Sequence, residues 1–531
     1  MATTTARPPV AKPGQAQVQI DEVELKASVS EILNRHPAVG MAVGVVRNGR
    51  LDFFYSHGVA DIASNTPITE DTVFRIASIT KTFTAIAVMQ LWEQGRVDLD
   101  APANDYLRAF QLVPARASHR PATLRHLLTH TSGLPELIHP SRALKYIFGE
   151  STELGRPLPT LGEYYRGRLR LVAEPGTRFV YTDHNFATAG QVVEDVSGEP
   201  LDVYLRKHVF EPLGMGDTDL IRSERVESGL ATGYNLRSSG ARAVTDRQWI
   251  TTAASSIYST PKDMARYVAA LLGGGANEHG SVLRPATLAL MFEPHYQPHP
   301  HIPGIGLAFD RFDLRGHLAI GHEGVLPGFN SQIFAAPDDG VGVVAFTNGA
   351  PNAMFWLPAE TIGLLRKLLR VPDDVIRRDV PQHPEVWGDL CGWYRLPPGR
   401  TGTRLRAAVG LGAEVFVRRG QLMLRVLTPV PAAYKGFVLH PDDGKDPYVF
   451  RIDASKVDLG TVRVIFSRAP GSGTMRVHLD VMPLSLERQP AGKSPRLRIA
   501  GALGAIGLAM TALAIRRRHA RGSTIDSMRR R

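Results

Sequence analysis

The chain has 531 residues, 43% of them hydrophobic and 21% charged. This composition is typical of folded globular domains, and a chain of this length is too long for one core. Its single cysteine, Cys391, excludes an internal disulfide and a multi-cysteine zinc site. The formal net charge is +11, but residues 493–531 carry ten Lys or Arg against one Asp, so +9 lies there and +2 on the other 492 residues. The excess therefore belongs to the tail, and we expect no nucleic-acid partner.

The first residues, 1–20, are polar and Pro-rich and hold no apolar run of the length that a secretory signal needs, so we expect them to be disordered. Two strands are predicted next, within residues 40–60, around the Asn-Gly turn at residues 48–49. A second hairpin is predicted within residues 331–348, around the turn at residues 337–340.

Three helices are expected between these hairpins, at residues 78–94, 186–196 and 261–272, and glycines follow the last turn of each. Strands at both ends of residues 21–372, with helices between them, predict an α+β fold and not a doubly wound one. We expect one antiparallel sheet that is flanked by helices and carries an inserted helical lobe.

A charged, Pro-bearing linker is expected at residues 373–384. After it, residues 385–490 consist of short alternating runs separated by turn residues, which predicts a small all-β barrel or sandwich domain. No catalytic cluster is visible in that domain. Its aromatic residues are most simply core residues: Trp387, Trp393 and Tyr394.

The basic tail, residues 491–531, contains seventeen uncharged residues at 499–515 with arginines on both sides. This run is at the short limit for a transmembrane helix, and we expect a single C-terminal span and a membrane-associated protein. A buried or interfacial helix or an unstructured tail are the alternatives. The arginines after the run favour a cytoplasmic C-terminus, whereas no export signal is visible, so the side of the membrane stays open. Without the span, a cytoplasmic protein is expected.

Ser78 and Lys81 stand three residues apart at the start of the helix that is predicted at 78–94, so their side chains share a face. The positive end of the helix dipole disfavours a lysine there, and a buried lysine in that field loses its proton more easily. Such an amine can activate a serine hydroxyl as a nucleophile. An N-capping serine beside a solvated lysine is the simpler alternative for this pair taken alone.

Four segments in order strengthen the catalytic interpretation: "FRIASITKTFTAIAVMQLWEQGRVDLDAPANDYL", "LRHLLTHTSGLP", "EPGTRFVYTDHNFATAGQVVEDVSGEPLDVYLRKHVFEPLGMGDT" and "GHEGVLPGFNS". Together they resemble the serine β-lactamase and penicillin-binding-protein-like family, near its class C β-lactamase, esterase and D-aminopeptidase branch. The similarity covers about residues 25–370.

The resemblance implies an acyl-enzyme mechanism without a cofactor or a metal. It assigns the nucleophile to Ser78, the base to Lys81 and a proton relay to Tyr181. The family's Lys-Thr-Gly strand corresponds to His322, Glu323 and Gly324, and the N–H group of the next residue joins that of the serine as the oxyanion hole. That next residue is Val325.

Asp183 departs from the family pattern, which has asparagine at this position. A carboxylate cannot donate a hydrogen bond to a substrate carbonyl, and its charge weakens a neighbouring lysine as a base. Two arrangements remain open. Asp183 pairs with His322, which we favour, or Asn185 takes over the donor role.

His322 replaces a lysine and is expected to titrate near neutrality. Glu323 stands where the family helps to bind the carboxylate of a β-lactam or of a peptide C-terminus, so an acid there should repel such substrates. The alternation of a strand leaves open that Glu323 points into the core or to solvent instead. These changes favour the hydrolysis of small esters or amides, including peptides, over β-lactamase activity.

Rival functions remain. A DD-peptidase, a D-aminopeptidase or a β-lactamase belongs to the same class, whereas a catalytically inactive acyl-binding or membrane scaffold protein does not. The His-rich stretch at residues 295–301 has no carboxylate at metal-ligand spacing and predicts a surface loop. The sequence predicts neither the oligomeric state nor the physiological substrate.

Overall fold

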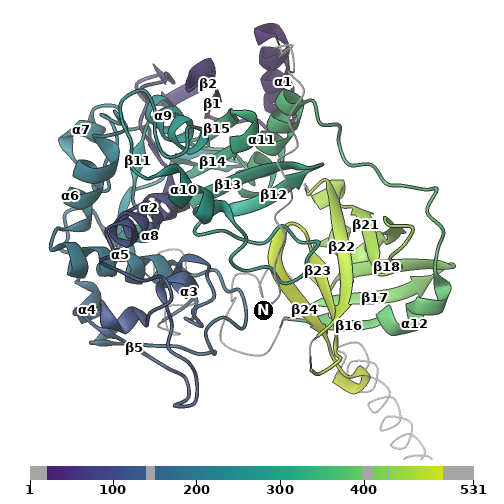
Figure 1. The fold of residues 1–531 in the computed structure, drawn as a ribbon. Helices are drawn as coiled ribbons and strands as arrows, with labels where there is room; N and C mark the ends of the chain where they lie inside the picture. Colours follow the sequence, from purple (N-terminus) through teal and green to yellow (C-terminus); the bar gives the residue numbers. More distant parts are fainter. Residues whose placement is uncertain are drawn as a thin grey trace, which may run out of the picture.

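The computed structural model describes residues 21–138, 150–396, 411–428, 430–457, 459–469 and 471–493. Two parts are visible in Figure 1, each built on its own sheet. We call residues 21–372 the N-terminal region and residues 385–490 the C-terminal region. The α+β class with a sheet-rich C-terminal part is thus confirmed.

The N-terminal region contains a seven-stranded antiparallel sheet in the order β12-β13-β14-β15-β1-β2-β3. The first strand of the chain pairs with the last strand of the region, as the sequence predicts. The strands are β1 (Gly40–Arg47), β2 (Arg50–Asp61), β3 (Thr66–Pro67), β12 (Asp310–Leu314), β13 (His317–Leu326), β14 (Phe329–Ala336) and β15 (Val341–Thr347).

Both predicted hairpins are confirmed. Asn48 and Gly49 connect β1 to β2 with positive φ angles of 52° and 74°, as an Asn-Gly hairpin turn requires. The second turn, between β14 and β15, is a short 3₁₀ helix at Pro337–Asp339 that ends on Gly340 with φ 67°. In this way turn chemistry fixes the register of strands that form the centre of the sheet.

Helices cover both faces of the sheet (Figure 1). Alternate residues of β1 divide between the two sides: Met41 and Val43 pack with α1 (Glu22–Arg35) and α11 (Ala353–Leu369), while Ala42 and Val46 belong to the larger core on the other side. On that second face lies α9 (Pro261–Leu272), with the bounds that the sequence predicts.

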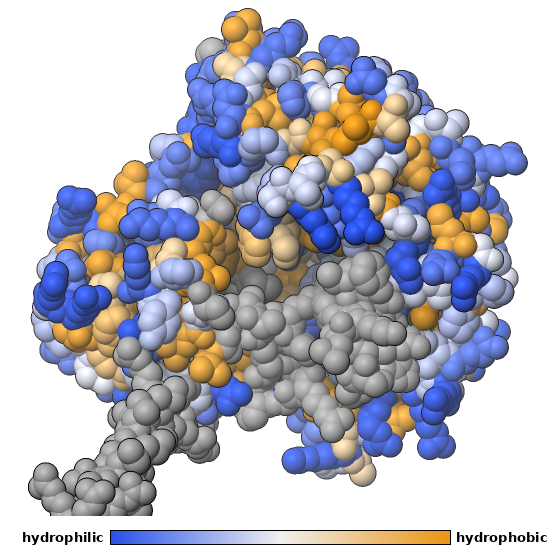
Figure 2. All heavy atoms as spheres, turned by 180° about the vertical axis from the view of Figure 1, so that it is seen from behind, coloured by the Kyte–Doolittle hydropathy of each residue, from blue (hydrophilic) through white to orange (hydrophobic). Residues whose placement is uncertain are grey.

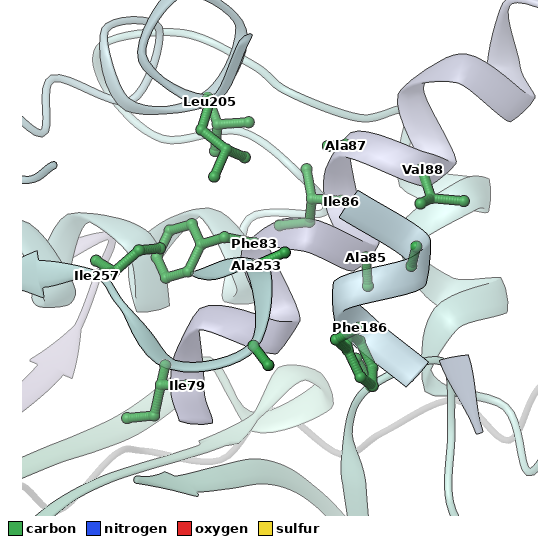
Figure 3. Packing of buried hydrophobic residues seen from close by; sticks show 14 of the residues in the cluster. Ile79, Phe83, Ala85, Ile86, Ala87, Val88, Phe186, Leu205, Ala253 and Ile257 are labelled. Carbon is green, nitrogen blue, oxygen red and sulfur yellow. The ribbon is translucent and has the colours of Figure 1, made fainter. Parts of the chain in front are cut away.

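The larger core centres on α2 (Thr80–Glu93), whose residues 80–91 are all buried. Figure 3 shows Phe83, Ile86 and Ala87 of this helix among side chains of the neighbouring helices. The helix packs against α5 (Asp183–Ser197) and α8 (Thr252–Ser255). A helix buried on all sides holds its first turn rigidly, and Ser78 and Lys81 lie at that end.

The predicted helix at 186–196 begins earlier than expected, at Asp183, because Thr182 caps it with a side-chain hydrogen bond from the His184 N–H. Gly198, with φ 80°, ends it as predicted. Thr182 and Asp183, which follow Tyr181, therefore lie at the N-terminus of α5 and not in a loop.

The C-terminal region is one antiparallel sheet of nine strands, in the order β19-β18-β17-β16-β24-β23-β22-β21-β20. Contact between β19 and β21 brings its two ends together, so the sheet curves into a barrel (Figure 1). The strands are β16 (Gly392–Arg395), β17 (Ala413–Arg418), β18 (Gln421–Val426), β19 (Phe437–Val438), β20 (His440–Pro441), β21 (Val449–Asp453), β22 (Thr461–Arg468), β23 (Met475–Leu479) and β24 (Met482–Arg488).

The region is not purely β, because α12 (Trp387–Leu390) and α14 (Pro431–Lys435) pack on the barrel. Tyr394 and Trp393 are buried in it, and Trp387 packs against the same core, as predicted. The barrel meets the N-terminal region where Ile302 packs with Val449 and Ile465.

Shorter elements complete the fold. They are β4 (Phe74–Arg75), β5 (Gln111–Val113), β6 (Ser151–Glu153), β7 (Arg168–Arg170), β8 (Tyr234–Arg237), β9 (Gly240–Ala243), β10 (Arg247–Trp249), β11 (Tyr258–Ser259), α3 (Leu124–Leu128), α4 (Leu161–Tyr165), α6 (Leu201–Leu205), α7 (Glu224–Glu227) and α10 (Pro285–Phe292). On the face shown in Figure 2, hydrophilic side chains are interspersed with smaller hydrophobic patches, as on other globular surfaces.

Within the described residues, no helix combines the length and the apolar character that a membrane span requires. The run at 499–515, which we expect to span a membrane, and the N-terminal residues 1–20 both lie outside the described residues.

Candidate active site

Ser78 lies in a single 3₁₀ turn, Ala77–Ile79, directly before α2. Its side chain is half-buried, whereas both neighbours are fully buried. Ala77 has a φ angle of +50°, in the left-handed region that residues with a Cβ rarely occupy. This conformation costs about 1 kcal/mol, and such strain gathers at sites where a side chain must be held in one orientation. The turn therefore presents the Ser78 hydroxyl from a rigid, strained support.

Lys81 is completely buried, and three acceptors surround its ammonium group. Its Nζ donates hydrogen bonds of 3.0 Å to Ser78 Oγ and 3.0 Å to the carbonyl oxygen of Ala254. It also forms a 2.8 Å ion pair with Oδ1 of Asp183. Ser78 and Lys81, three residues apart in the sequence, are thus in direct contact. The second acceptor, the Ala254 carbonyl of α8, was not predicted from the sequence.

Tyr181 joins this pair through a hydrogen bond between its hydroxyl group and that of Ser78. Its ring lies 4.8 Å below Lys81 Nζ and stacks on His130 at a centroid distance of 4.3 Å. Burial and the carboxylate of Asp183 raise the pKa of Tyr181 well above its usual value. The phenol therefore stays protonated and can donate its proton.

His322 lies on β13 with its side chain buried and its ring centroid 6.5 Å from that of Tyr181. Its Nδ1 is 2.6 Å from the carbonyl oxygen of Glu323, so Nδ1 carries the proton and donates. Burial and the nearby charge of Lys81 lower the pKa of His322 to about 3. The prediction that His322 titrates near neutrality is therefore wrong, because the ring is desolvated beside a cation.

Gly324 is the point where β13 packs against the nucleophile's turn. A Cβ on Gly324 would stand 2.1 Å from the carbonyl oxygen of Ile76 and 2.2 Å from Ser331 Oγ. Ser331, on β14, donates a 2.8 Å hydrogen bond to that same carbonyl. Only glycine allows this close approach, which fixes the distance between β13 and Ser78.

Val325 follows Gly324 along an open edge of the sheet. The neighbouring strand β12 begins at Asp310, opposite Gly321, so among the described residues no strand pairs with β13 beyond Gly321 on that side. This is the position from which the backbone of a strand can contact a substrate.

Asp183 and Asn185 differ from what we expected. Asp183 pairs with Lys81 and not with His322, because both sit at the N-terminal ends of packed helices, α5 and α2. Asn185 is fully buried, where Oδ1 accepts a hydrogen bond from Ser132 and Nδ2 lies 3.0 Å from His130 Nδ1. Its amide thus contacts Ser132 and His130, which argues against the alternative in which Asn185 donates to a substrate.

Glu323 points to solvent, on the opposite side of β13 from His322. The surrounding protein and Asp310, on the adjacent strand β12, raise its pKa to about 7. Asp310 itself has a pKa raised to about 6 by burial. Although Glu323 keeps contact with water, both carboxylates lie near enough to raise the pKa of Tyr181. Asp310 was not predicted as a site residue, since only the pairing of β12 with β13 brings it here.

A small cleft opens beside Tyr181, with room for about one water molecule. It is lined by Glu136, Leu137, Glu150, Tyr181, Thr182, Asp183 and Trp249. Three of these residues are acids and one is a tryptophan. The cleft therefore has an acidic wall and borders Tyr181 and Asp183.

The His-rich stretch forms no metal centre within the described part of the chain, where no group of three or more His, Cys, Asp or Glu side chains is arranged to hold a metal. His295 contacts Arg125, and His299 packs between His301 and His478 of the barrel. These rings thus take part in contacts within the protein.

Comparison with known proteins now identifies the family and the fold. The family model described as Beta-lactamase matches residues 25–364. The chain belongs to the beta-lactamase family. Esterase EstB of Burkholderia gladioli is 34% identical over 378 residues, which cover 70% of this chain and 86% of EstB. The putative penicillin-binding protein PbpX of Bacillus subtilis is 27% identical over 346 residues, covering 64% of this chain and 78% of PbpX.

Solved structures of this family share the fold. The octameric penicillin-binding protein homologue from Pyrococcus abyssi aligns with a TM-score of 0.56 at 22% identity, over 88% of this chain and 100% of that one. SurE aligns with a TM-score of 0.59 at 21% identity, over 88% of this chain and 99% of its own. Both alignments extend past the N-terminal region, so the fold similarity includes part of the C-terminal region.

Proposed function

We propose that the protein is a serine hydrolase that forms an acyl-enzyme on Ser78 and hydrolyses esters or amides. One observation carries the proposal: the completely buried Lys81 places Nζ 3.0 Å from Ser78 Oγ. A solvated lysine beside an N-capping serine would not be buried. Membership of a family with an esterase relative supports the same function.

The first step is the activation of Ser78. Lys81 Nζ lies 3.0 Å from Ser78 Oγ, so in its neutral form the amine can accept the hydroxyl proton. Ser78 Oγ then attacks the substrate carbonyl carbon as its proton moves to Lys81. The backbone N–H groups of Ser78 and Val325 stabilise the resulting oxyanion, and each such donor contributes about 2.7 to 4 kcal/mol in comparable sites.

The second step is the departure of the leaving group. Tyr181, protonated and hydrogen-bonded to Ser78, donates its proton to the leaving oxygen or nitrogen and recovers one from Lys81. The serine proton therefore ends on the leaving group. Water then attacks the acyl-enzyme and loses a proton by the same route, which releases the acid and restores Ser78.

Substrate preference follows from the charges at β13. His322 is neutral, so the site lacks the second cation that a substrate carboxylate would bind. Esters or amides without a carboxylate at this position are therefore preferred over β-lactams and over peptides with a C-terminal carboxylate.

A fluorophosphonate probe tests the nucleophile on the full-length protein. We expect wild type and Ser228→Ala, a substitution of an exposed serine on a surface turn, to be labelled equally, and Ser78→Ala to be unlabelled. Labelling of Ser78→Ala at the wild-type rate would refute the mechanism. An unlabelled wild type would indicate the catalytically inactive alternative.

Hydrolysis of short p-nitrophenyl esters, compared with hydrolysis of nitrocefin, tests the substrate preference. We expect the esters to have the higher kcat/KM. A clear preference for nitrocefin would refute the specificity argument while leaving the role of Ser78 intact.

A further inference from the structure

Tyr181 is held in place by a residue to which the proposed mechanism gives no part. His130 lies shortly after α3, in the segment "LRHLLTHTSGLP", and its side chain is buried. Its carbonyl oxygen accepts a 2.8 Å hydrogen bond from the Val180 N–H, and its Nδ1 accepts one of 3.2 Å from the Thr182 N–H. Val180 and Thr182 are the residues directly before and after Tyr181. One residue therefore fixes the backbone of Tyr181 on both sides.

The imidazole ring of His130 supports the phenol as well. It stacks on the ring of Tyr181, with centroids 4.3 Å apart and an angle of 30° between the two planes. Phe179 and Phe186 contact the same imidazole at centroid distances of 5.7 Å and 5.1 Å. A ring that is packed on several sides has little freedom to turn, so it also limits how far the phenol can tilt.

Hydrogen bonds define the tautomer of His130. Besides the Thr182 N–H, the amide nitrogen Nδ2 of Asn185 contacts Nδ1, at 3.0 Å, and it can only donate. Ser132 donates to Oδ1 of Asn185, which fixes the orientation of that amide. Two donors at Nδ1 place the proton of the ring on Nε2. Burial and the charge of Lys81 lower the pKa of His130 well below its usual value, so the ring is uncharged.

The backbone of His130 is strained. Its φ angle of +56° lies in the left-handed region, which a residue with a Cβ rarely occupies. Ala77, beside the nucleophile, has a φ angle of +50°. Such strain persists only where the surrounding structure fixes the residue, and it gathers at sites where one orientation of a side chain matters. The supports of Ser78 and of Tyr181 share this feature.

We propose that His130 is a positioning residue that keeps the Tyr181 hydroxyl against Ser78 and thereby controls proton donation to the leaving group. This inference rests on the proposed hydrolase function and adds a residue to its mechanism. Tyr181 reaches Ser78 through a single hydrogen bond. A displacement of about 1 Å at such a group can lower a rate about 100-fold. A histidine that only fills the core would affect activity through stability alone.

Two esters with the same acyl group test this role on the full-length enzyme. The leaving group of p-nitrophenyl butyrate departs as a stable anion, whereas benzyl butyrate releases an alkoxide that needs a proton. The ratio of the two kcat/KM values therefore measures proton donation. It does not depend on the fraction of enzyme that is folded, so a loss of stability alone leaves it unchanged.

Two substitutions of His130 separate the ring from the acceptor. His130→Asn keeps an acceptor and tolerates the positive φ angle, but removes the ring. We expect it to lower kcat/KM about 100-fold for benzyl butyrate and about fivefold or less for p-nitrophenyl butyrate. His130→Phe keeps a ring and removes the acceptor, and it should change the ratio in the same direction. Tyr181→Phe gives the limiting ratio, because it removes the proton donor itself.

His478→Asn is the matched control. This histidine of the barrel is also buried, and each of its ring nitrogens lies 2.8 Å from a serine hydroxyl. Its substitution should lower stability and leave the ratio as in wild type. Asn185→Ala is a milder change near Tyr181, since it takes one of two donors from Nδ1 of His130. It should shift the ratio about threefold, as expected for one lost hydrogen bond.

An equal loss for both esters in His130→Asn and His130→Phe, or an unchanged ratio in both, would overturn the inference. If neither variant can be obtained as folded protein, Asn185→Ala decides, and a wild-type ratio there refutes the role of His130. If the fluorophosphonate probe labels Ser78 while these ratios stay unchanged, the hydrolase function stands without this residue. If Ser78 is not labelled and neither ester is hydrolysed, both proposals fail.

Discussion

The two regions of the molecule treat buried charge in different ways. In the C-terminal region, Arg451 and Asp442 are buried together and joined by two hydrogen bonds, with Arg463 as a third member. In the N-terminal region, Lys81 is buried among a hydroxyl, a carbonyl and a poorly aligned carboxylate. A counter-ion joined by two hydrogen bonds serves stability, whereas an ammonium group that also contacts a serine hydroxyl lies against a group that can react, and this difference distinguishes the barrel from the site.

Backbone strain also has different causes in the C-terminal and the N-terminal region. Arg419 has a φ angle of 51° in the tight turn between β17 and β18, next to Gly420, where such a conformation is usual. Ala77 has a similar angle in the buried support of Ser78, where no hairpin requires it. Strain at a turn is a consequence of topology, and strain at Ala77 positions a side chain.

Removal of the buried cation should give the largest effect. We expect Lys81→Met to lower kcat about 1,000-fold or more, since it removes the proton acceptor of Ser78 and leaves Asp183 unpaired. Lys262→Met is the matched control, because this lysine is partly exposed and pairs with the exposed Asp71. Steady-state hydrolysis of a p-nitrophenyl ester measures both. A Lys81→Met enzyme with more than a tenth of wild-type activity would contradict the assignment.

Gly324→Ala should give the next largest effect. The new methyl group would collide with the Ile76 carbonyl oxygen and Ser331, so β13 must move away from the nucleophile's turn. We expect a loss of about 100-fold to 1,000-fold in kcat, the range seen when an oxyanion donor is lost.

Gly388→Ala, in α12, is the counterpart in the barrel, where an added Cβ meets no atom within 4 Å. It should leave activity unchanged and raise the free energy of unfolding by at most about 1 kcal/mol. If Gly324→Ala and Gly388→Ala behaved alike in kinetic assays and in chemical denaturation, the position of β13 would not depend on its close approach to Ile76 at Gly324.

Acid should weaken both regions through buried neutral histidines. Burial lowers the pKa of His478, in the barrel, to about 4, below the usual 6.5 of an unfolded histidine. Between these values the unfolded state binds more protons, so stability is lost as the pH falls from 6.5 towards 4. His478→Gln should reduce the slope of unfolding free energy against pH by at most about 1.4 kcal/mol per pH unit.

Denaturation in urea from pH 4.5 to 7 measures this slope. His57→Gln serves as the control, because His57 is exposed on β2. A slope in His478→Gln equal to that of wild type would show that His478 takes up no additional proton on unfolding. His322 should behave as His478 does, since its pKa is also lowered, to about 3.

The smallest effect is expected for an exposed ion pair of the barrel. Arg468 and Asp389 lie 2.7 Å apart, with 58% and 49% of their side chains exposed. Arg468→Ala should change the free energy of unfolding by less than about 1 kcal/mol, because water screens such pairs. Urea denaturation at low and at high salt measures this change, and a loss well above that size would mean that surface pairs do stabilise the barrel.

Local signals in the sequence determined much of the fold. Turn residues at 48–49 and 337–340 predicted both hairpins, and glycines predicted where the helices end. The alternation of short runs predicted the β structure after residue 385. These features could be predicted because they depend on local geometry. They arise from hydrogen bonds between near neighbours and from the φ angles that single residues allow. The short helices of the barrel were missed, since four or five residues give no clear period.

The site was predicted as a set of residues without their arrangement in space. The spacing of Ser78 and Lys81 determines that the two share a helix face, because one helical turn separates them. Their other partners depend on contacts across large sequence separations, as between Lys81 and Ala254 or between Ser331 and Ile76. No local rule predicts which carbonyl or carboxylate a folded chain brings to an ammonium group.

The sequence by itself therefore determined the reactive pair and the strands and helices that carry it, since both depend on short-range geometry. Only the tertiary structure decided what surrounds that pair. In it, Asp183 pairs with Lys81, Asn185 belongs to a buried network, His322 is neutral, and Glu150 lines the cleft. Burial and packing set these outcomes, because the energy of a charge depends on its desolvation and its neighbours in space and not on its position in the chain.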